Sequence, residues 1–301
     1  MNTTRIKDKI IDGRTLATNI KMSCKDFLSH VSMQPTLVII QVGHNPASDV
    51  YVKGKKKDCA EIGITCKHIE YPTCISEVQL CREIQALNQD NAVNGILVQL
   101  PLPNHMDPHR ILTTIDPSKD VDGFHPANLG ALWVDKPTFV SCTPLGILAL
   151  VKSVCDDLTG KQVVVIGRSH HVGKPTAFLF TKENATVTLT HSKTKNLAQL
   201  TKQADILIVA MGQPQFIDHT YIKEGAIIID VGIHRQKDGH LCGDVQFDDV
   251  YTHVKAITPV PGGVGPMTRA MLMYNCILAS CKQHGFTEPS LQTFVQPYQN
   301  V

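Results

Sequence analysis

The sequence lacks long apolar runs and a strong charge imbalance, and each absence excludes a class of protein. No hydrophobic stretch in the 301 residues approaches the roughly 18 residues expected of a membrane span. The first nine residues carry charge without an apolar segment behind them, which argues against a secretory signal. With 29 basic and 27 acidic residues, the net charge of +2 does not favour nucleic acid or a membrane surface as a partner. We therefore expect a cytoplasmic protein that binds neither.

Also absent are the cysteine and histidine spacings that bind metals or form disulfide frameworks. The ten cysteines include no C-x-x-C pair, and the 14 histidines include no H-E-x-x-H pattern. His170 and His171 are neighbours in sequence and would point in different directions. Scattered cysteines behave as small buried hydrophobic residues in a reducing compartment, so we expect neither a metal nor disulfides.

The sequence does contain enough length and apolar content for two α/β domains. Its 301 residues are 43% hydrophobic, and about 100–200 residues per domain is usual. In the first half, apolar runs alternate with helical patterns, and this order indicates a parallel sheet with right-handed crossovers. In the helix expected at 76–88, Val78, Cys81 and Leu87 should face inward. The expected strands are 36–42, 65–70 and 95–100, and the other expected helices are 10–27, 48–62 and 107–115.

A second β-α-β series begins at Lys161 and predicts another parallel sheet. A helix from Thr143, acting as N-cap, to about Asp156 should connect the two series. The expected strands are 162–166, 186–190, 205–210, 226–230 and 256–258, and the expected helices are 174–181, 196–203 and one ending near 282. We therefore place a first domain at residues 1–140 with a returning helix at 268–284, a second domain at 141–267, and a loose tail at 285–301.

The stretch from Gly43 to Lys57 follows the first strand and combines a phenol ring with several amines. It is expected to form a turn and then a helix capped by Ser48. Tyr51 and Lys55 are four residues apart, so their side chains leave the same helix face one turn apart. An open α/β sheet places its chemistry at the carboxyl ends of its strands. The alternative is that Tyr51 is ordinary packing and that the lysines form a solvated face.

A variant of the dinucleotide fingerprint follows the strand at 162–166. Its small residues would let the backbone approach a phosphate at a helix N-terminus, although the spacing differs from G-x-G-x-x-G. The next strand ends at His191-Ser-Lys-Thr, without the carboxylate that holds the ribose of NAD. Lys193 and Arg168 suit a 2′-phosphate, so the sequence favours NADP over NAD. The alternative is a solvated loop on a sheet that binds no nucleotide. The small residues of the fingerprint are Gly167, Ser169 and Gly173.

Several segments together resemble one family, the bifunctional methylenetetrahydrofolate dehydrogenase/methenyltetrahydrofolate cyclohydrolases. They stand in the family's order and span about residues 6 to 284. The resemblance implies two α/β domains with a folate cleft between them, the second a Rossmann-type parallel sheet. The segments are Pro46-Ala-Ser-Asp-Val-Tyr-Val-Lys-Gly-Lys-Lys-Lys, Gly95-Ile-Leu-Val-Gln-Leu-Pro-Leu-Pro, Lys119-Asp-Val-Asp-Gly-Phe-His-Pro, Cys142-Thr-Pro-Leu-Gly, Gly167-Arg-Ser, Val172-Gly-Lys-Pro and Pro259-Val-Pro-Gly-Gly-Val-Gly-Pro-Met-Thr.

The resemblance implies that Lys55, rather than the other lysines of its helix, is catalytic. Gln99 would orient the Lys55 amine, Asp122 would bind the pterin ring, and Tyr51 would lie against the folate. The implied folate-binding residues are Tyr51, Val52, Lys55, Gln99, Leu100, Pro101, Asp122, Gly262, Gly263 and Pro266.

The resemblance also implies an NADP site in the second domain. His170 and His171 depart from the family's usual residues, which leaves the details of the pyrophosphate contacts open. The implied cofactor-binding residues are Cys142, Thr143, Gly167, Arg168, Ser169, Val172, Gly173, His191, Ser192, Lys193, Gly232, Ile233, Gly265 and Thr268.

Such an enzyme would oxidise 5,10-methylenetetrahydrofolate by hydride transfer to NADP, a step that depends on positioning. It would then hydrolyse the methenyl cation to 10-formyltetrahydrofolate with Lys55 as general base. Structural alternatives are that Gln99 only ends a strand, that Asp122 stabilises its own turn, and that Cys142 is a cleft wall or core residue rather than a nucleophile. Functional alternatives are a monofunctional NAD-linked dehydrogenase and a non-catalytic folate- or nucleotide-binding regulator. The family resemblance also suggests a homodimer.

Overall fold

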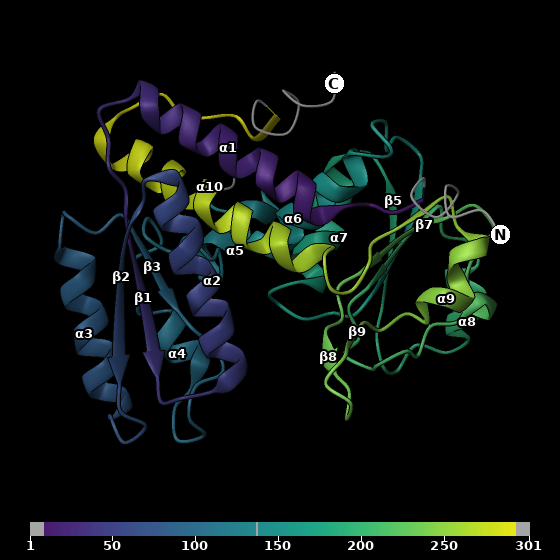
Figure 1. Ribbon diagram of the computed structural model, residues 1–301, viewed down its shortest axis with the longest axis horizontal. Helices are drawn as coiled ribbons and strands as arrows, with labels where there is room; N and C mark the ends of the chain where they lie inside the picture. Colours follow the sequence, from purple (N-terminus) through teal and green to yellow (C-terminus); the bar gives the residue numbers. More distant parts are fainter. Residues whose placement is uncertain (1–8, 137, 293–301) are drawn as a thin grey trace. The chain divides into compact units, whose positions relative to one another are not determined.

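The computed structural model describes residues 9–136 and 138–292, which form two compact units. The first-sheet unit comprises Thr18–Cys142 and the chain from Arg269 onward, and the second-sheet unit comprises the chain up to Ala17 and Thr143–Thr268. Figure 1 shows each unit as a sheet with helices packed on it. Of the predicted tail, residues 293–301 lie outside the described part of the chain.

The N-terminal segment belongs to a different unit from the one that the sequence predicted. Ile10 forms a parallel bridge with Ile257, and the Ile11 N–H donates to the Ile257 carbonyl at 2.9 Å. This pairing adds a short strand-like contact at the last strand of the second sheet. Sequence patterns carry no information on such long-range pairing, and for this reason they place the segment around Ile10 in the first domain.

The first-sheet unit contains a three-stranded parallel sheet in the order β2-β1-β3. The predicted β-α-β-α-β arrangement is confirmed, with the central strand β1 buried along its whole length. The strands are β1 (Thr36–Val42), β2 (Thr65–Tyr71) and β3 (Gly95–Val98), and the helices are α1 (Gly13–His30), α2 (Pro46–Ile62), α3 (Glu77–Gln89), α4 (Pro108–Leu112), α5 (Pro126–Trp133) and most of α10 (Val264–His284).

Two details of these helices differ from prediction. The fully buried residues of α3 are Leu80 and Ile84, and Cys81 and Leu87 pack against the same core as predicted, whereas Val78 is 50% exposed. Helix α5 had no clear periodicity in the sequence and was not predicted.

The two predicted N-caps are also wrong. Helix α2 starts at Pro46, so Asn45 precedes it and its Oδ1 accepts from the Ser48 N–H at 3.2 Å. Ser48 instead lies inside the helix, where its hydroxyl donates to the Leu100 carbonyl at 3.3 Å. Helix α6 begins at Cys142, which places Thr143 inside it.

The second-sheet unit contains a five-stranded parallel sheet in the order β10-β7-β6-β4-β5. The chain starts at β4, moves to the edge strand β5, and then returns past β4 to the other side through β6, β7 and β10. This reversal is the doubly wound Rossmann arrangement, and it confirms the predicted fold class. The strands are β4 (Gln162–Ile166), β5 (Thr186–Thr190), β6 (Ile206–Val209), β7 (Ile227–Asp230) and β10 (Ala256–Ile257), with helices α6 (Cys142–Lys152), α7 (Gly173–Lys182), α8 (Leu197–Thr201) and α9 (Phe247–Val250).

Helix α9 and a small ribbon of this unit were absent from the prediction. Strands β8 (His234–Arg235) and β9 (Leu241–Cys242) pair antiparallel as a small ribbon after β7. Strands of two residues carry no periodicity to detect. Among the helices of the described chain, none combines the length and the apolar character needed to cross a membrane.

Candidate active site

Lys55 and Gln99 meet at the carboxyl end of the first sheet. Lys55 comes from the third turn of α2 after β1, and Gln99 directly follows β3. The Lys55 Nζ donates to the Gln99 Oε1 at 3.0 Å, and the Gln99 Nε2 donates to the Leu100 carbonyl at 2.8 Å. The Gln99 N–H donates to the Ile40 carbonyl, so the backbone that carries this amide continues the sheet. A rigid strand end therefore orients the amine.

Burial separates Lys55 from the other lysines of the same helix. Lys55 is 8% exposed, whereas Lys53, Lys56 and Lys57 are exposed. A buried amine beside an amide oxygen has the environment of a functional residue. The exposed lysines have the environment of a solvated helix face. Tyr51 is half-buried one helical turn before Lys55.

Asp122 lies near Lys55, in a turn that its neighbour Asp120 stabilises. Asp120 is 1% exposed and accepts hydrogen bonds from the backbone N–H groups of Phe124 and His125 and from the Asn128 amide. The turn is therefore stabilised by Asp120, which leaves Asp122 available for another role. Burial raises the pKa of the Asp122 carboxyl, and the nearby Lys55 charge opposes this shift. A carboxylate near a lysine at a strand end can accept hydrogen bonds from a ligand.

The remaining folate-binding candidates of this unit differ in how exposed their side chains are. Leu100 packs against the core of the sheet, and Pro101 is exposed. Val52 is 3% exposed and therefore contributes chiefly to packing. The sequence offered no signal that Val52 faces inward, because it stands between Tyr51 and Lys53, two residues with polar groups.

Cys142 is an interior residue. Its side chain is 1% exposed, and its thiol donates to the Val121 carbonyl at 3.4 Å. The Asn275 amide also donates to the Val121 and Val140 carbonyls, which ties α10 to this segment. Burial raises the pKa of the Cys142 thiol well above its usual range. A contact from this residue to a cofactor would therefore have to come through its backbone.

The turn after β4 has the geometry of a phosphate-binding loop. Gly167 has φ +121°, and a Cβ on it would lie 2.1 Å from the Ala210 carbonyl oxygen. A Cβ on Gly173, the first residue of α7, would lie 1.9 Å from the Gly167 carbonyl oxygen. The Ser169 hydroxyl accepts from the N–H groups of Val172 and Gly173, so this side chain folds back onto the start of α7. Only glycine permits so close a turn, and the resulting cradle fits a pyrophosphate.

The loop after β5 is shaped by two side chains and presents two others. The His191 Nδ1 accepts from the Lys193 N–H at 3.1 Å, and the Thr194 hydroxyl accepts from the His191 N–H at 2.9 Å. Ser192 and Lys193 remain exposed. The Gly167 N–H donates to the Thr190 carbonyl, so this loop and the glycine turn lie next to each other. Arg168 in that turn is also exposed, and together the cations suit a 2′-phosphate.

A pair of buried carboxyls near Gly232 and Ile233 was missed by the sequence analysis. Asp230 ends β7 and accepts from the N–H groups of Gly232, Asp244 and Val245, each at 3.0 Å. Burial, with a further contribution from Asp244, raises the pKa of Asp230 to about 6 despite these hydrogen bonds.

Asp244 has no exposed surface and accepts from the Met211 and Gly212 N–H groups and from the His234 Nε2 at 2.7 Å. These bonds hold the loops after β6 and β7 at the carboxyl edge of the second sheet. Ile233, 48% exposed, lies on the surface of that edge. The signal in the sequence was two Asp residues flanking glycines, Asp230-Val-Gly and Gly243-Asp.

The other candidates of the second-sheet unit cluster around the start of α10. The Thr143 and Thr268 hydroxyls are 2.9 Å apart. Gly262 has φ +122°, and a Cβ on Gly263 would lie 2.7 Å from the Thr258 side chain. Gly265 and Pro266 fall in the first turn of α10, so this helix begins four residues before the predicted start at 268.

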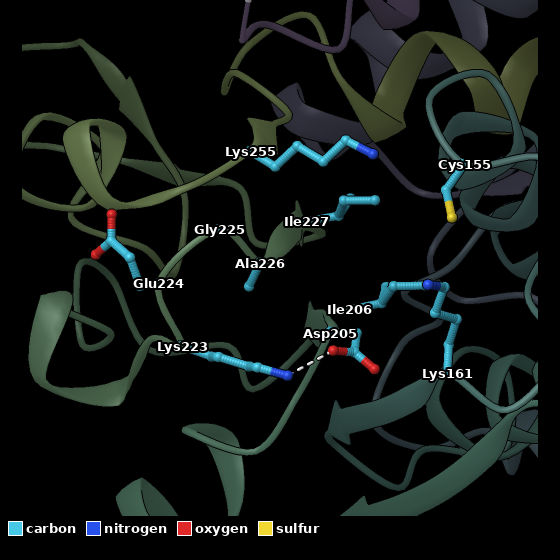
Figure 2. Close-up of a pocket in the computed structure, with 10 residues that line it drawn as sticks. All are labelled: Cys155, Lys161, Asp205, Ile206, Lys223, Glu224, Gly225, Ala226, Ile227 and Lys255. Carbon is cyan, nitrogen blue, oxygen red and sulfur yellow. Dashed lines mark hydrogen bonds and ion pairs between the residues drawn. The ribbon is translucent and has the colours of Figure 1, made fainter.

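A separate cavity of about 140 Å³ opens at the amino ends of the second sheet, opposite the glycine turn. Figure 2 shows Lys161, Lys223 and Lys255 around it, with the Lys223 Nζ 2.6 Å from the Asp205 carboxylate. Ligands of doubly wound sheets bind at the carboxyl ends of the strands. The cavity is therefore not the cofactor site.

His105 and His109 are four residues apart at the start of α4, a spacing that would suit a metal on a longer helix. His105 instead hydrogen-bonds the Ile75 carbonyl. The described residues contain no group of three or more histidine, cysteine or acidic side chains that could hold a metal ion.

Comparison with known proteins gives consistent matches over nearly the whole chain. Residues 11–122 match the tetrahydrofolate dehydrogenase/cyclohydrolase catalytic domain, and residues 141–284 match the NAD(P)-binding domain of the same family. A curated relative, the bifunctional protein FolD of Lachnoclostridium phytofermentans, is 52% identical over 91% of this chain and 98% of its own.

Two solved structures are also similar. The bifunctional FolD dehydrogenase/cyclohydrolase of Campylobacter jejuni is 45% identical with a TM-score of 0.88, covering 91% of this chain and 98% of its own. The Trypanosoma brucei FolD, complexed with NADP and an inhibitor, is 36% identical with a TM-score of 0.86, covering 91% and 97%. The chain belongs to the tetrahydrofolate dehydrogenase/cyclohydrolase family.

Proposed function

We propose that this protein catalyses two consecutive reactions on the one-carbon unit of tetrahydrofolate. The first is the NADP-dependent oxidation of 5,10-methylenetetrahydrofolate to the 5,10-methenyl cation. The second is hydrolysis of that cation to 10-formyltetrahydrofolate. The observation that carries the proposal is the buried Lys55, whose amine is held 3.0 Å from the Gln99 amide oxygen at the carboxyl end of the first sheet.

In the hydrolysis, Lys55 is the general base. Water adds to the bridging carbon of the cation, and the Lys55 Nζ accepts a proton from that water. The Gln99 oxygen orients the amine, and its own amide is fixed by the Leu100 carbonyl. The carbinol O–H then loses its proton to solvent as the formyl C=O forms, and the bond from the bridging carbon to N5 breaks. The Lys55 ammonium returns its proton to N5, so the formyl group stays on N10 and one proton is released overall. Asp122 anchors the pterin by accepting hydrogen bonds from its N–H groups.

The oxidation requires positioning more than acid or base catalysis. Bound NADP supplies the hydride acceptor. The glycine turn after β4 fits its pyrophosphate, because Gly173 leaves the start of α7 open to a phosphate. Arg168, Ser192 and Lys193 would hold the 2′-phosphate, a role supported by their exposure beside the glycine turn.

Neither functional alternative is favoured. A monofunctional NAD-linked dehydrogenase would not need the Lys55–Gln99 pair, and the loop after β5 carries a lysine where NAD enzymes carry an acid. A non-catalytic regulator is disfavoured by the retention of Lys55, Gln99 and Asp122 together.

A single cuvette experiment tests the proposed function. Purified protein is mixed with 5,10-methylenetetrahydrofolate and either NADP or NAD. We expect NADPH to form, and the absorbance of the methenyl cation to rise and then decay. Persistent methenyl absorbance would indicate a dehydrogenase without hydrolase activity, and no change with either nucleotide would contradict the proposal.

The choice of NADP predicts a selective effect of Arg168. Arg168→Gln should raise the KM for NADP about tenfold and leave the KM for NAD unchanged, because a charge-assisted contact to the 2′-phosphate is lost. Initial rates of nucleotide reduction measure both constants. Lys195→Gln, at another exposed lysine of the following loop, is the matched control. An equal rise for the two nucleotides would contradict the assignment.

We also propose that the protein is a cytoplasmic homodimer that acts on tetrahydrofolate derivatives. The dimer is supported by the family resemblance, and light scattering of the purified protein would test it, with a monomer mass as the contrary result. A cytoplasmic location is supported by ten cysteines that are all free thiols. Microscopy of the tagged protein would test the location.

A further inference from the structure

Arg269 lies directly over Gly54, the residue before Lys55. Arg269 is in α10 and Gly54 in α2. A Cβ on Gly54 would lie 2.0 Å from the Arg269 Nη1 and 3.1 Å from its Cζ. The guanidinium therefore occupies the space that a side chain at position 54 would fill. A glycine inside a helix costs about 1 kcal/mol relative to alanine, so its presence here calls for a packing reason.

A buried carboxylate fixes one end of this guanidinium. The Arg269 Nε lies 3.3 Å from the Oδ2 of Asp58, a residue that is 3% exposed. The Asp58 Oδ1 accepts from the Lys21 Nζ at 2.6 Å, so the anchor is itself held from a third helix. No described residue provides a hydrogen-bond acceptor for the two Nη groups of Arg269, and the side chain is 31% exposed. The Nε edge of the fork is thus paired with a protein carboxylate, and the two Nη groups have no acceptor among the described residues.

The surroundings leave an excess of positive charge. Lys21, Lys57 and Arg269 face the carboxylates of Asp58 and Glu61, which gives three cations against two anions. An additional anion at the open edge of the guanidinium would balance the cluster. A guanidinium binds a carboxylate through two parallel hydrogen bonds, which requires a rigid fork of this kind.

The position on α2 connects Arg269 with the proposed substrate. Gly54 is three residues after Tyr51, so it lies one turn along the face that carries the phenol ring. It is also adjacent to Lys55, but its direction differs by about 100° around the helix axis. Arg269 therefore lies beside the ring proposed to contact folate and away from the amine proposed to perform the hydrolysis.

We propose that Arg269 is a substrate-binding residue that holds a carboxylate of the glutamate moiety of the folate. This inference rests on the proposed function, because that function supplies the carboxylate. The contact is remote from the reacting carbon and is the same before and during the reaction. It therefore contributes to substrate binding and KM, and not to kcat.

The test compares two substrates in the wild type and in Arg269→Gln. One is 5,10-methylenetetrahydrofolate, and the other is its bis-amide, in which both glutamate carboxylates are replaced by neutral carboxamides of similar shape. We expect the wild type to show a KM about tenfold higher for the bis-amide. Arg269→Gln should show that higher KM for both substrates, with unchanged kcat and an unchanged KM for NADP. Arg269→Lys should recover part of the loss, because it keeps the charge without the fork.

Gly54→Ala tests the same contact without removing a charge. The added methyl displaces the end of a flexible side chain, which the fold can accommodate. This variant should raise the KM for the charged substrate only, and it should add nothing in the Arg269→Gln background, where the clash is relieved. Gly54→Ala therefore still tests the proposed contact if Arg269→Gln is poorly folded.

Lys53→Gln is the matched control for net charge. Lys53 is exposed on the same helix and is not one of the three cations of this cluster, and we expect both KM values to stay as in the wild type. The proposal is overturned if Arg269→Gln and Gly54→Ala leave both KM values unchanged or raise them equally, or if Lys53→Gln reproduces the effect. Absence of NADP reduction by the wild type with both substrates would instead contradict the proposed function.

Discussion

Replacing Lys55 by methionine is expected to abolish hydrolysis of the methenyl cation while NADP binding is retained. General-base catalysis contributes about 10²–10⁴-fold, so the hydrolysis rate should fall by at least about 100-fold. Methionine keeps the length and apolar stem of a side chain that is 8% exposed, but it has no atom that accepts a proton from water. Lys55→Gln should behave alike, because an amide is not a base at neutral pH.

The measurement is the decay of methenyl absorbance, together with NADP binding by fluorescence titration. Lys56→Met is the control, because Lys56 is exposed on the neighbouring face of α2. Full hydrolase activity in Lys55→Met would exclude Lys55 as the base. Loss of both hydrolysis and NADP binding, with a lowered Tm, would indicate a structural role instead.

Gly173→Ala is expected to weaken NADP binding strongly, by about 100-fold or more, and to destabilise the second-sheet unit. The new Cβ would lie 1.9 Å from the Gly167 carbonyl oxygen and 2.5 Å from its carbon. These are backbone atoms, so the whole turn has to open. Overpacking of this kind costs about 1–3 kcal/mol, and displacement of the turn removes the backbone groups that would face a phosphate.

Titration with NADP and thermal unfolding measure the two effects. Gly130→Ala is the control, because Gly130 lies in helix α5 and a Cβ there would meet nothing within 4 Å. We expect that variant to bind NADP as the wild type does. Unchanged binding and unchanged Tm in Gly173→Ala would show that the turn does not hold the cofactor.

The fold followed from local signals where elements were long and regular. Apolar runs such as 36–42 and 162–166 matched β1 and β4, and Gly63 ends α2 with φ +93° as predicted. Failures occurred where the deciding contacts were distant. The segment around Ile10 pairs with Ile257, and the ribbon β8–β9 consists of two-residue strands.

For the candidate site, too, local patterns identified the residue types, and only the tertiary structure distinguished between similar neighbours. Residue patterns alone left Lys55 equivalent to three neighbouring lysines, and the family resemblance was needed to select it. Asp120 and Asp122 were likewise two acids in one turn. The structure distinguishes them, because Asp120 receives the hydrogen bonds that hold the turn. The roles proposed for these residues stay predictions until the variants are measured.

The amino-acid types by themselves therefore predicted three features. These are the alternating strands and helices, the glycine turn before α7, and a lysine one turn after a tyrosine. Tertiary packing alone decided that Lys55 is the lysine buried against Gln99, that the carboxyls of Asp230 and Asp244 are buried in the second-sheet unit, and that position 54 is glycine. The last is the clearest case, since Gly54 and Arg269 are far apart in sequence and meet only because the fold brings α2 and α10 into contact. Burial and contact arise from the packing of distant elements, and the local pattern of a single segment does not encode them.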